Sequence, residues 1–442
     1  FWRTNLAVVF GVAIAVAVMI GSQIVGDSVQ ASLRELALAR LGRVDSAVVA
    51  ALPFTDALPD RLAKNSRSMA PILHFAGIVK HQGSNKSAAK VLIYGVDERY
   101  WRLQGAAAEP LGERDAIISE ALAQEFGAKP NDGILVRMEK PSEIPQESLH
   151  GRREGSVRTV RFSVKKTLPG GFALEPQQGE LRVVYVALST LQKELDQAGK
   201  ANVLLVAGAA ITAEELRDGL RMEDLGMKLR PVPGGMQLES GAGLLRDDQV
   251  ARVTETATKL GLRSEPLLTY LANSMKIGNR EVPYSLVTAT PEVTEGIRLN
   301  AWTMRQTGAK PGDKLQMEYY QWRREGNLDT ASALFTVAGA TAIGDRTMAP
   351  DYPGISDADK VSDWDPPFPM NLDKIRPVDE KYWADYRTTP KAFISIADGQ
   401  RIWGSRFGKV SSVRLYPAGA GKEQAWIAAF LPSVDLAKDG LS

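Results

Sequence analysis

The densest group of chemically active side chains is an acidic run in the second half of the chain. Residues 357–365 read DADKVSDWD, and this stretch contains the carboxylates of Asp357, Asp359, Asp363 and Asp365. Calcium takes six to eight oxygen ligands, so this run is the best candidate for a metal site. It lacks the glycine and the terminal glutamate of an EF-hand loop. The sequence favours the simpler alternative, in which these carboxylates bond to turn backbone and face solvent.

Other patterns that could support catalysis or nucleotide binding are incomplete. Ser87 and Lys90 have the spacing of a serine–lysine pair, but they lie in a polar turn before a strand and not at the start of a helix. Residues 418–422 end in Gly-Lys, but Glu423 follows where a P-loop needs serine or threonine. None of the three histidines has metal-ligand spacing with another: His74, His81 and His150. We therefore expect no catalytic residue and no cofactor in this chain.

Composition narrows the class of protein further. The 442 residues carry 54 Lys and Arg against 52 Asp and Glu, a net charge of +2. A nucleic-acid binder needs a concentrated basic face, so we expect no nucleic-acid partner. The absence of cysteine excludes a disulfide scaffold, a thiol nucleophile and a thiolate metal site. The length allows about two or three domains.

The N-terminal residues 1–26 predict a transmembrane helix. No charged side chain occurs from Thr4 to Gly26, and about 20 apolar residues suffice to cross a bilayer. Arg3 precedes this run, which favours a cytoplasmic N-terminus and an exported remainder. A cleaved signal peptide would have a shorter apolar region with a small-residue cleavage site, and a buried core helix of a soluble protein is a further alternative.

Small residues recur every four positions along this helix and predict a packing surface. Ala13, Ala17 and Gly21 form one such stripe, which lets helix backbones approach closely in lipid. Alanine and glycine are also common in any membrane helix, so composition alone explains the stripe equally simply. We predict that the stripe packs against helices outside this chain.

The helical pattern continues beyond the apolar run. Residues 27–43 place Val29, Leu33 and Leu36 on one face, and Gly42 is a natural C-terminal stop. We therefore predict a stalk helix that carries the membrane helix out of the bilayer. A rigid stalk of this kind can transmit motion, and it can also be a passive tether. We assign helix coupling to these three apolar residues.

The remainder of the chain contains an internal repeat. Five short blocks recur in the same order, among them a shared Gly-Ala-Lys-Pro-x-Asp. In that block a helix should end at Phe126 or Thr307, with the following glycine in the left-handed conformation and a proline preventing continuation. The five paired blocks are Pro71–Phe75 with Pro266–Tyr270, Val91–Glu98 with Tyr284–Glu292, Ile117–Asp132 with Arg298–Asp313, Phe162–Val164 with Phe335–Val337, and Val186–Val206 with Ile394–Leu415.

These signals predict an α+β fold of two related modules with β-rich insertions. The first module spans 44–210 and the second 211–418, and residues 419–442 form a return segment toward the membrane. The second module contains the longest irregular stretch, 342–391, which is rich in proline. So long a loop is usually functional or docked on a partner. Most aromatic residues of this module should be core or loop anchors.

The quoted segments resemble a known family. The opening WRTNLAVVFGVAIAVAVMIGSQIVGDSVQASLRELALARLGRVD resembles the first membrane helix and stalk of FtsX-like/MacB-type ABC-transporter permeases. VLIYGVDERYW, GAKPGDKL, SDWDPPFP and TPKAFISIADGQRIWGSRFG resemble the long extracytoplasmic domain of a bacterial subgroup of these permeases. The resemblance covers nearly all of the chain at the level of pattern.

The resemblance implies a permease subunit in the bacterial inner membrane, with most of the chain periplasmic. It implies a dimer with a second permease copy, an ABC ATPase subunit that binds ATP and Mg²⁺, and possible periplasmic partners. It also implies mechanotransmission, in which ATP-driven motion in the cytoplasm reaches the periplasmic domain through the stalk. ATPase activity then belongs to the separate subunit, and this chain is no enzyme.

Two other classes of protein remain open from the sequence. A single-pass membrane-anchored sensor or binding ectodomain would share the helix and the outer domain. A membrane-anchored periplasmic hydrolase would need a convergent nucleophile or acid–base site, which three histidines make difficult.

Overall fold

The computed structural model divides the chain into two compact units, each described here by itself. Unit 1 comprises Phe1–Lys140, Val157–Thr212 and Leu441–Ser442, and unit 2 is built on Ala213–Gly440. The split follows Thr212, two residues after the predicted module boundary at 210. The structure describes residues 1–62, 67–141, 157–175, 177, 179–322, 328–344, 348, 351–352, 354–366, 368–417, 419 and 421–442.

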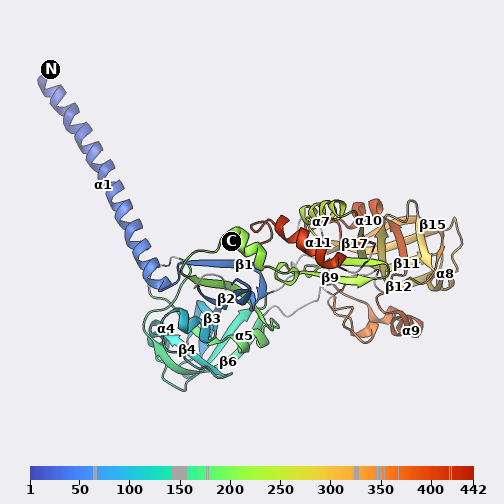
Figure 1. The fold of residues 1–442 in the computed structure, drawn as a ribbon, viewed down its shortest axis with the longest axis horizontal. Helices are drawn as coiled ribbons and strands as arrows, with labels where there is room; N and C mark the ends of the chain where they lie inside the picture. The colour runs from blue at the N-terminus through green and yellow to red at the C-terminus, as the bar shows by residue number, and fades with distance from the viewer. Residues whose placement is uncertain are drawn as a thin grey trace. The chain divides into compact units, whose positions relative to one another are not determined.

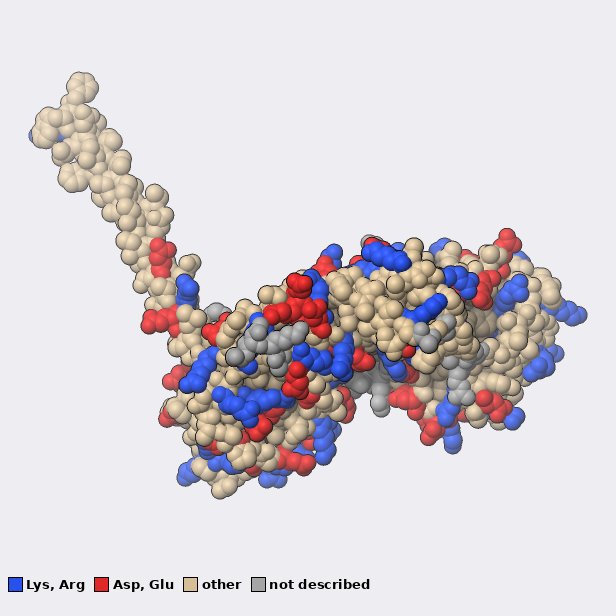
Figure 2. Space-filling model, viewed as in Figure 1, with Lys and Arg blue, Asp and Glu red and all other residues tan. Residues whose placement is uncertain are grey.

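The chain begins with a single continuous helix, α1 (Trp2–Leu41), which includes both the apolar run and most of the predicted stalk. None of its residues is buried, and Figure 1 shows it extending away from the strands of unit 1. The helix ends where the sequence predicts, because Gly42 has a φ of 62° that glycine adopts without strain. Figure 2 shows the N-terminal part of α1 almost free of charged side chains, whereas both signs of charge cover the body.

Unit 1 is an eight-stranded sheet whose central strands close on themselves. The strand order is β1-β8-β2-β3-β7-β4-β6-β5, and β5 also pairs with β2, so six strands form a closed ring. The elements after α1 are β1 (Ser46–Thr55), α2 (Leu58–Leu62), β2 (Ser68–His81), β3 (Ser87–Val96), α3 (Glu98–Leu103), β4 (Asp115–Ser119), α4 (Glu120–Phe126), β5 (Gly133–Glu139), β6 (Val157–Leu168), β7 (Val183–Ala187), α5 (Leu188–Glu194) and β8 (Lys200–Ala207).

The alternation of side chains along these strands gives unit 1 two cores, one on each face of the sheet. Leu73 and Ile93 belong to one core, together with α4 and α5 residues such as Leu191. Their neighbours Ile72 and Tyr94 belong to the other. Strands buried on both faces read as nearly continuous apolar runs, as β3 and β7 do.

Unit 2 begins with a helical segment and contains a nine-stranded sheet. Its elements are α6 (Ala213–Gly219), η1 (Met222–Leu225), β9 (Met227–Val232), β10 (Gly235–Ser240), α7 (Asp247–Lys259), β11 (Arg263–Ile277), β12 (Arg280–Thr290), β13 (Ile297–Asn300), α8 (Ala301–Thr307), β14 (Lys314–Trp322), β15 (Leu328–Thr341), η3 (Val361–Asp363), η4 (Leu372–Lys374), α9 (Pro377–Tyr386), β16 (Ala392–Ser395), α10 (Ile396–Trp403), β17 (Ser412–Tyr416), α11 (Lys422–Phe430) and η5 (Leu431–Ser433).

The two sheets have the same connections, which confirms the predicted repeat and the α+β class. In unit 2 the order β12-β16-β13-β15-β14-β11, closed by β12–β11, reproduces β3-β7-β4-β6-β5-β2 of unit 1. The parallel and antiparallel senses also agree pair by pair. The register agrees too, because Leu73 faces Gly95 as Leu268 faces Ala289. Each of the six ring strands in unit 1 thus has a counterpart in unit 2.

The shared Gly-Ala-Lys-Pro-x-Asp block has the predicted geometry in both units. α4 and α8 end at Gly127 and Gly308, whose φ values are 67° and 66°. The side chain of Asp132 accepts a hydrogen bond from the backbone of Lys129 at 2.8 Å, and Asp313 repeats this bond with Lys310 at 2.8 Å. The block therefore has a structural role: it ends each helix and forms the turn into the next strand.

The long stretch 342–391 differs from its prediction as an irregular loop. It contains α9, and its described aromatic residues belong to the core of unit 2, among them Tyr352, Trp364 and Trp383. The helix begins with Pro377 at its first turn, and the backbone N–H of Arg376 donates to Asp379 at 3.0 Å. The stretch therefore packs on its own unit. Most aromatic residues of this unit are core residues, as predicted.

Candidate functional site

The apolar part of α1 is long enough to cross a membrane. It contains an 18-residue window with a mean hydropathy of 2.4, and none of that window is buried. The predicted packing residues Ala13, Ala17 and Gly21 lie exposed on this segment, and a Cβ added to Gly21 would meet no atom within 4 Å. No described element of this chain covers the stripe. Its packing role therefore stays a prediction.

The stalk meets unit 1 at a defined junction with α3. The side chain of Gln104, directly after α3, donates from Nε2 to the carbonyl of Leu41 at 3.4 Å. Its Oε1 accepts from the backbone N–H of Arg43 at 3.3 Å. Arg40 adds hydrogen bonds from its guanidinium to the backbone carbonyls of Gln177 and Gly179. One side chain from the body and one from the stalk thus fix the end of α1 to unit 1.

A cleft of about 550 Å³ lies beside this junction. The stalk contributes Leu36, Ala39, Arg40 and Gly42 to its lining. The rest of unit 1 contributes glycines, aliphatic residues and Glu180, and also four aromatic side chains: Tyr100, Trp101, Phe172 and Tyr185. The three coupling residues predicted from the sequence therefore have different surroundings. Leu36 lines the cleft, whereas Val29 and Leu33 do not. Leu33 is half-buried, and Val29 is exposed.

The aromatic side chains of the cleft pack on one another and are uncharged. Trp101 and Tyr185 have ring centroids 5.6 Å apart, and the Tyr185 hydroxyl accepts a hydrogen bond from the backbone of Phe172 at 3.0 Å. Burial raises the pKa of both Tyr100 and Tyr185, so both hydroxyls stay protonated at neutral pH. These aromatic side chains offer no acid, base or nucleophile at neutral pH.

The other residues singled out by sequence do not form a chemical site among the described residues. The part of the chain that the structure describes contains no group of three or more acidic or histidine side chains that could hold a metal. Asp357, Asp359 and Asp363 are exposed, and Asp365 is half-buried. Asp359 lies 3.7 Å from Arg387. The calcium interpretation thus has no support in this arrangement.

The described histidines and the serine–lysine pair all lie in unit 1. His74 stacks on Tyr94 with centroids 4.6 Å apart, and burial lowers its pKa. His81 is buried, with its Nδ1 2.8 Å from Ser84 Oγ and its Nε2 3.2 Å from Asp132 Oδ2. Ser87 and Lys90 lie on β3 and not on a helix. His150 lies outside the described residues.

The junction residues of the body were not identified from the sequence. α3 carries a recognisable start signal, since Asp97 precedes the helix and accepts from the backbone N–H of Arg99 at 2.9 Å. That signal could have placed a short helix at 98–103. It could not have shown that Gln104 contacts Leu41, because the contact joins segments far apart in the sequence.

A long apolar helix fixed to a duplicated α/β domain defines a membrane-anchored protein with a large extracytoplasmic part. The family model for the MacB-like periplasmic core domain matches residues 6–229, just over half of the chain, and the chain belongs to this family. This domain occurs in ABC-type transporter permeases, and the extracytoplasmic part is accordingly periplasmic. The match confirms the family to which the sequence was compared.

Solved structures of the same kind of domain resemble parts of the chain. The periplasmic region of MacB from Actinobacillus actinomycetemcomitans is 14% identical, with 38% of this chain and 76% of that chain covered and a TM-score of 0.25. The extracellular domain of the noncanonic ABC-type transporter YknZ from Gram-positive bacteria is 12% identical, with 39% and 87% covered and a TM-score of 0.25. No curated protein sequence matches the chain.

Proposed function

We propose that the chain is a permease subunit of an ABC-type transporter in the bacterial inner membrane. Its periplasmic domain couples ATP hydrolysis by a separate ATPase subunit to export or to work on the envelope. Two copies of the permease and the ATPase subunit form the working assembly. ATP and Mg²⁺ bind to the ATPase, and this chain supplies no catalytic group.

The observation that carries this proposal is the attachment of a membrane-length helix to the body. α1 runs without a break from the apolar segment to Leu41, and Gln104 bonds to both sides of its end. A helix is stiff over such a length, so a displacement at its membrane end reaches α3 through this junction. A passive tether would need no such attachment, and a flexible linker would serve it equally well.

The proposal is tested by measuring motion at the junction in the assembled transporter. The chain has no cysteine, so Ser28→Cys and Arg102→Cys place two spin labels, one on the stalk and one on α3. The complex with its ATPase is reconstituted in lipid, and the label-to-label distance is measured by pulsed electron paramagnetic resonance. We expect ATP to shift the distance distribution. An unchanged distribution in a complex that hydrolyses ATP contradicts the proposal.

Leu36 provides a matched pair of variants for the same measurement. Leu36→Asp puts a charge into the junction cleft, whereas Leu38→Asp makes the same change on an exposed residue that does not line the cleft. We expect Leu36→Asp to reduce the ATP-dependent shift while ATP turnover continues, and Leu38→Asp to leave both unchanged. If the two variants change the ATP-dependent shift equally, the cleft has no role in coupling.

A further inference from the structure

A small cavity in unit 2 lies where the stretch 342–391 packs on strand β12. β12 contributes Tyr284 and Leu286 to its lining, and the stretch contributes residues of α9 together with Trp364 and Lys391. The free space is about 10 Å³, which is enough for one species of the size of a water molecule. A ligand of this cavity is therefore no larger than a water molecule or a monatomic ion.

The backbone of Lys391 holds its amine in the wall of this cavity. The backbone N–H of Lys391 donates to the carbonyl of Leu286 at 2.8 Å, and its carbonyl accepts from the backbone N–H of Asn300 at 3.0 Å. The residue is 6% exposed. Its Nζ lies 5.0 Å from the ring centroid of Trp302 and 5.1 Å from that of Tyr382. The amine thus stays inside unit 2, next to two aromatic rings.

Two side chains of the lining carry hydrogen-bond donors without an acceptor in the described part of the chain. An ammonium group has three N–H donors, and the described surroundings of Lys391 Nζ are ring faces, which attract a cation but are weak acceptors. The indole N–H of Trp364 is buried and also finds no partner among the described residues. Buried donors without an acceptor are costly, so a ligand that accepts from them would be stabilising.

The charged groups around Lys391 do not provide it with a counter-ion of its own. Asp379 attracts the amine and Arg376 repels it. These two form a neutral pair, in which Arg376 donates to Asp379 from Nε at 2.8 Å and from Nη2 at 2.9 Å. Arg387 adds a positive charge to the lining, and the exposed Asp359 lies 3.7 Å from it. Burial accordingly lowers the pKa of Lys391 to about 8, so that most of the amine is still protonated at pH 7.

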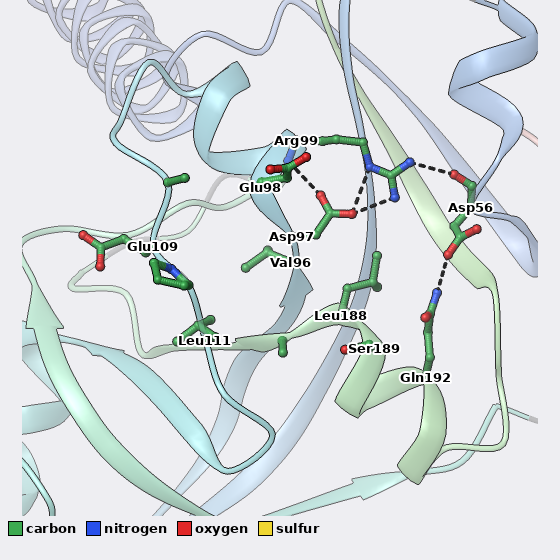
Figure 3. A pocket seen from close by; sticks show the side chains of 13 residues that line it. Asp56, Val96, Asp97, Glu98, Arg99, Glu109, Leu111, Leu188, Ser189 and Gln192 are labelled. Atoms are coloured by element: carbon green, nitrogen blue, oxygen red, sulfur yellow. Dashed lines mark hydrogen bonds and ion pairs between the residues drawn. The ribbon is translucent and has the colours of Figure 1, made fainter.

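Unit 1 shows that the fold itself does not require this amine. The counterpart of Lys391 is Val183, an apolar residue that is fully buried. Figure 3 shows a larger cavity of unit 1, whose arginine, Arg99, donates to the carboxylate of Asp97 and to the backbone carbonyl of Asp56. Lys391 has no bonded carboxylate of this kind among the described residues. The buried amine is therefore a feature of unit 2 alone.

We propose that this cavity binds a chloride ion, which links the stretch 342–391 to strand β12. The ion accepts hydrogen bonds from Lys391 Nζ and from Trp364 Nε1. A water molecule would fit the same space, but it brings no negative charge, and hydrogen bonds between two charged groups are the stronger ones. The inference goes beyond the coupling function and does not depend on it, because the cavity belongs to unit 2 and the stalk junction to unit 1.

The first test measures chloride binding through the line width of the chloride NMR signal. The full chain in neutral detergent is titrated at pH 7 and constant ionic strength, with gluconate as the replacing anion. We expect a saturable broadening that bromide removes, and that sulfate, which is too large for the cavity, removes at least about tenfold less well. The broadening should also be lost by pH 9.5, because Lys391 then releases its proton. An absence of saturable broadening, or equal competition by sulfate, overturns the proposal.

Two variants and a second measurement then locate the ion. Lys391→Met removes the charge and should abolish the saturable broadening, whereas Lys310→Met, at an exposed lysine outside the lining, should leave it unchanged. The unmodified chain provides a readout that needs no variant. At a chloride concentration equal to the Kd, amides of α9 and β12 that exchange only after the ion leaves should exchange about twofold more slowly than in gluconate. Broadening that persists in Lys391→Met, or equal exchange in the two anions, refutes the site.

Discussion

Units 1 and 2 repeat one fold but fill the same positions with different side chains. Gly95 on β3 faces Leu191 on α5, and a Cβ on Gly95 would lie 2.9 Å from Leu191 Cδ2. The counterparts in unit 2 reverse the sizes, because Ala289 on β12 faces Gly399 on α10, whose added Cβ would overlap that of Ala289. The helix and the strand approach closely in both units. Each unit thus keeps a glycine on one side of this contact, on the strand in unit 1 and on the helix in unit 2.

A second pair of counterparts exchanges one kind of interaction for another. His74 stacks on Tyr94 in unit 1, with centroids 4.6 Å apart. Their counterparts Thr269 and Thr288 join through their hydroxyls at 2.8 Å. Cross-strand neighbours of this kind interact through whichever groups their side chains carry. The duplication has therefore kept the backbone and the pairing while the side-chain chemistry diverged.

The largest expected effect comes from removing the leucine side chain that packs against Gly95 in unit 1. Leu191 is fully buried, so Leu191→Ala should destabilise unit 1 by about 2–5 kcal/mol through the lost contacts and the cavity left behind. Hydrogen exchange measured by mass spectrometry reports each unit separately, which a single melting temperature does not. We expect faster exchange in β3 and β7 with β12 and β16 unchanged. Leu334→Ala, at a residue 68% exposed, is the control.

The reciprocal change in unit 2 sharpens the same comparison. Gly399→Leu overfills the contact between α10 and β12, and overpacking of this kind typically costs about 1–3 kcal/mol. Ala289→Gly in the same chain should recover part of that loss, because it restores the combination found in unit 1. If Gly399→Leu is tolerated alone, or if Ala289→Gly worsens it, the contact with Ala289 does not limit the size of residue 399.

A smaller effect should follow from the buried amine of unit 2. Lys391 is the counterpart of Val183, and its Nζ lies 5.0 Å from the Trp302 ring centroid and 5.1 Å from that of Tyr382. Burial lowers the pKa of Lys391 to about 8. Lys391→Met should therefore stabilise unit 2 at pH 7 by about 1–3 kcal/mol, less the lost cation–π contacts. Hydrogen exchange of β12 and β16 measures this gain.

The pH dependence follows from the same shift. The unfolded chain holds the Lys391 proton up to its ordinary pKa near 10.5, whereas the folded chain releases it near 8. The unfolded state therefore binds more protons in this window, and the stability of unit 2 should rise from pH 8 to pH 9.5. Lys391→Met should lose that rise, and Lys310→Met, at an exposed lysine, should retain it. A rise that persists in Lys391→Met contradicts the assignment.

The smallest expected effect concerns the histidine stack of unit 1. Burial lowers the pKa of His74 below its ordinary value of 6.5, so the unfolded state binds its proton more readily. The stability contributed by neutral His74 is present above pH 6.5 and is lost as the pH falls below it. His74→Phe keeps the stack without a titration, and His74→Thr copies unit 2. Both should flatten the acid side of the stability profile of unit 1, and an unchanged profile would refute the role of His74.

The sequence predicted the N-terminal helix and the elements that repeat, and it missed α9 and the Gln104 junction. The Gly-Ala-Lys-Pro-x-Asp block was readable because glycine and proline act locally, and Gly127 and Gly308 take the left-handed conformation as expected. α9 was missed because its surroundings are rich in proline and its burial depends on distant strands. The Gln104 junction was missed for the same reason, since hydrogen bonds between distant segments leave no local pattern.

The same limit applied to the candidate sites. Acidic residues close together in the sequence suggested a metal site, but the structure keeps Asp357 and Asp363 exposed at their own turns. Leu36 was selected from helical spacing together with Val29 and Leu33, and only the position of the body distinguishes it from them.

The path of the chain has a consequence for how such a protein could arise and be altered. The chain leaves unit 1 after Thr212 and returns to it at Leu441. There the backbone of Ser442 forms two hydrogen bonds with that of Val49 on β1, at 2.8 and 2.9 Å. Unit 2 is thus a domain inserted into the chain of unit 1, between Thr212 and Leu441. Both ends of the inserted segment join unit 1. Evolution can therefore enlarge, exchange or delete unit 2 while unit 1, which carries the stalk, keeps its fold.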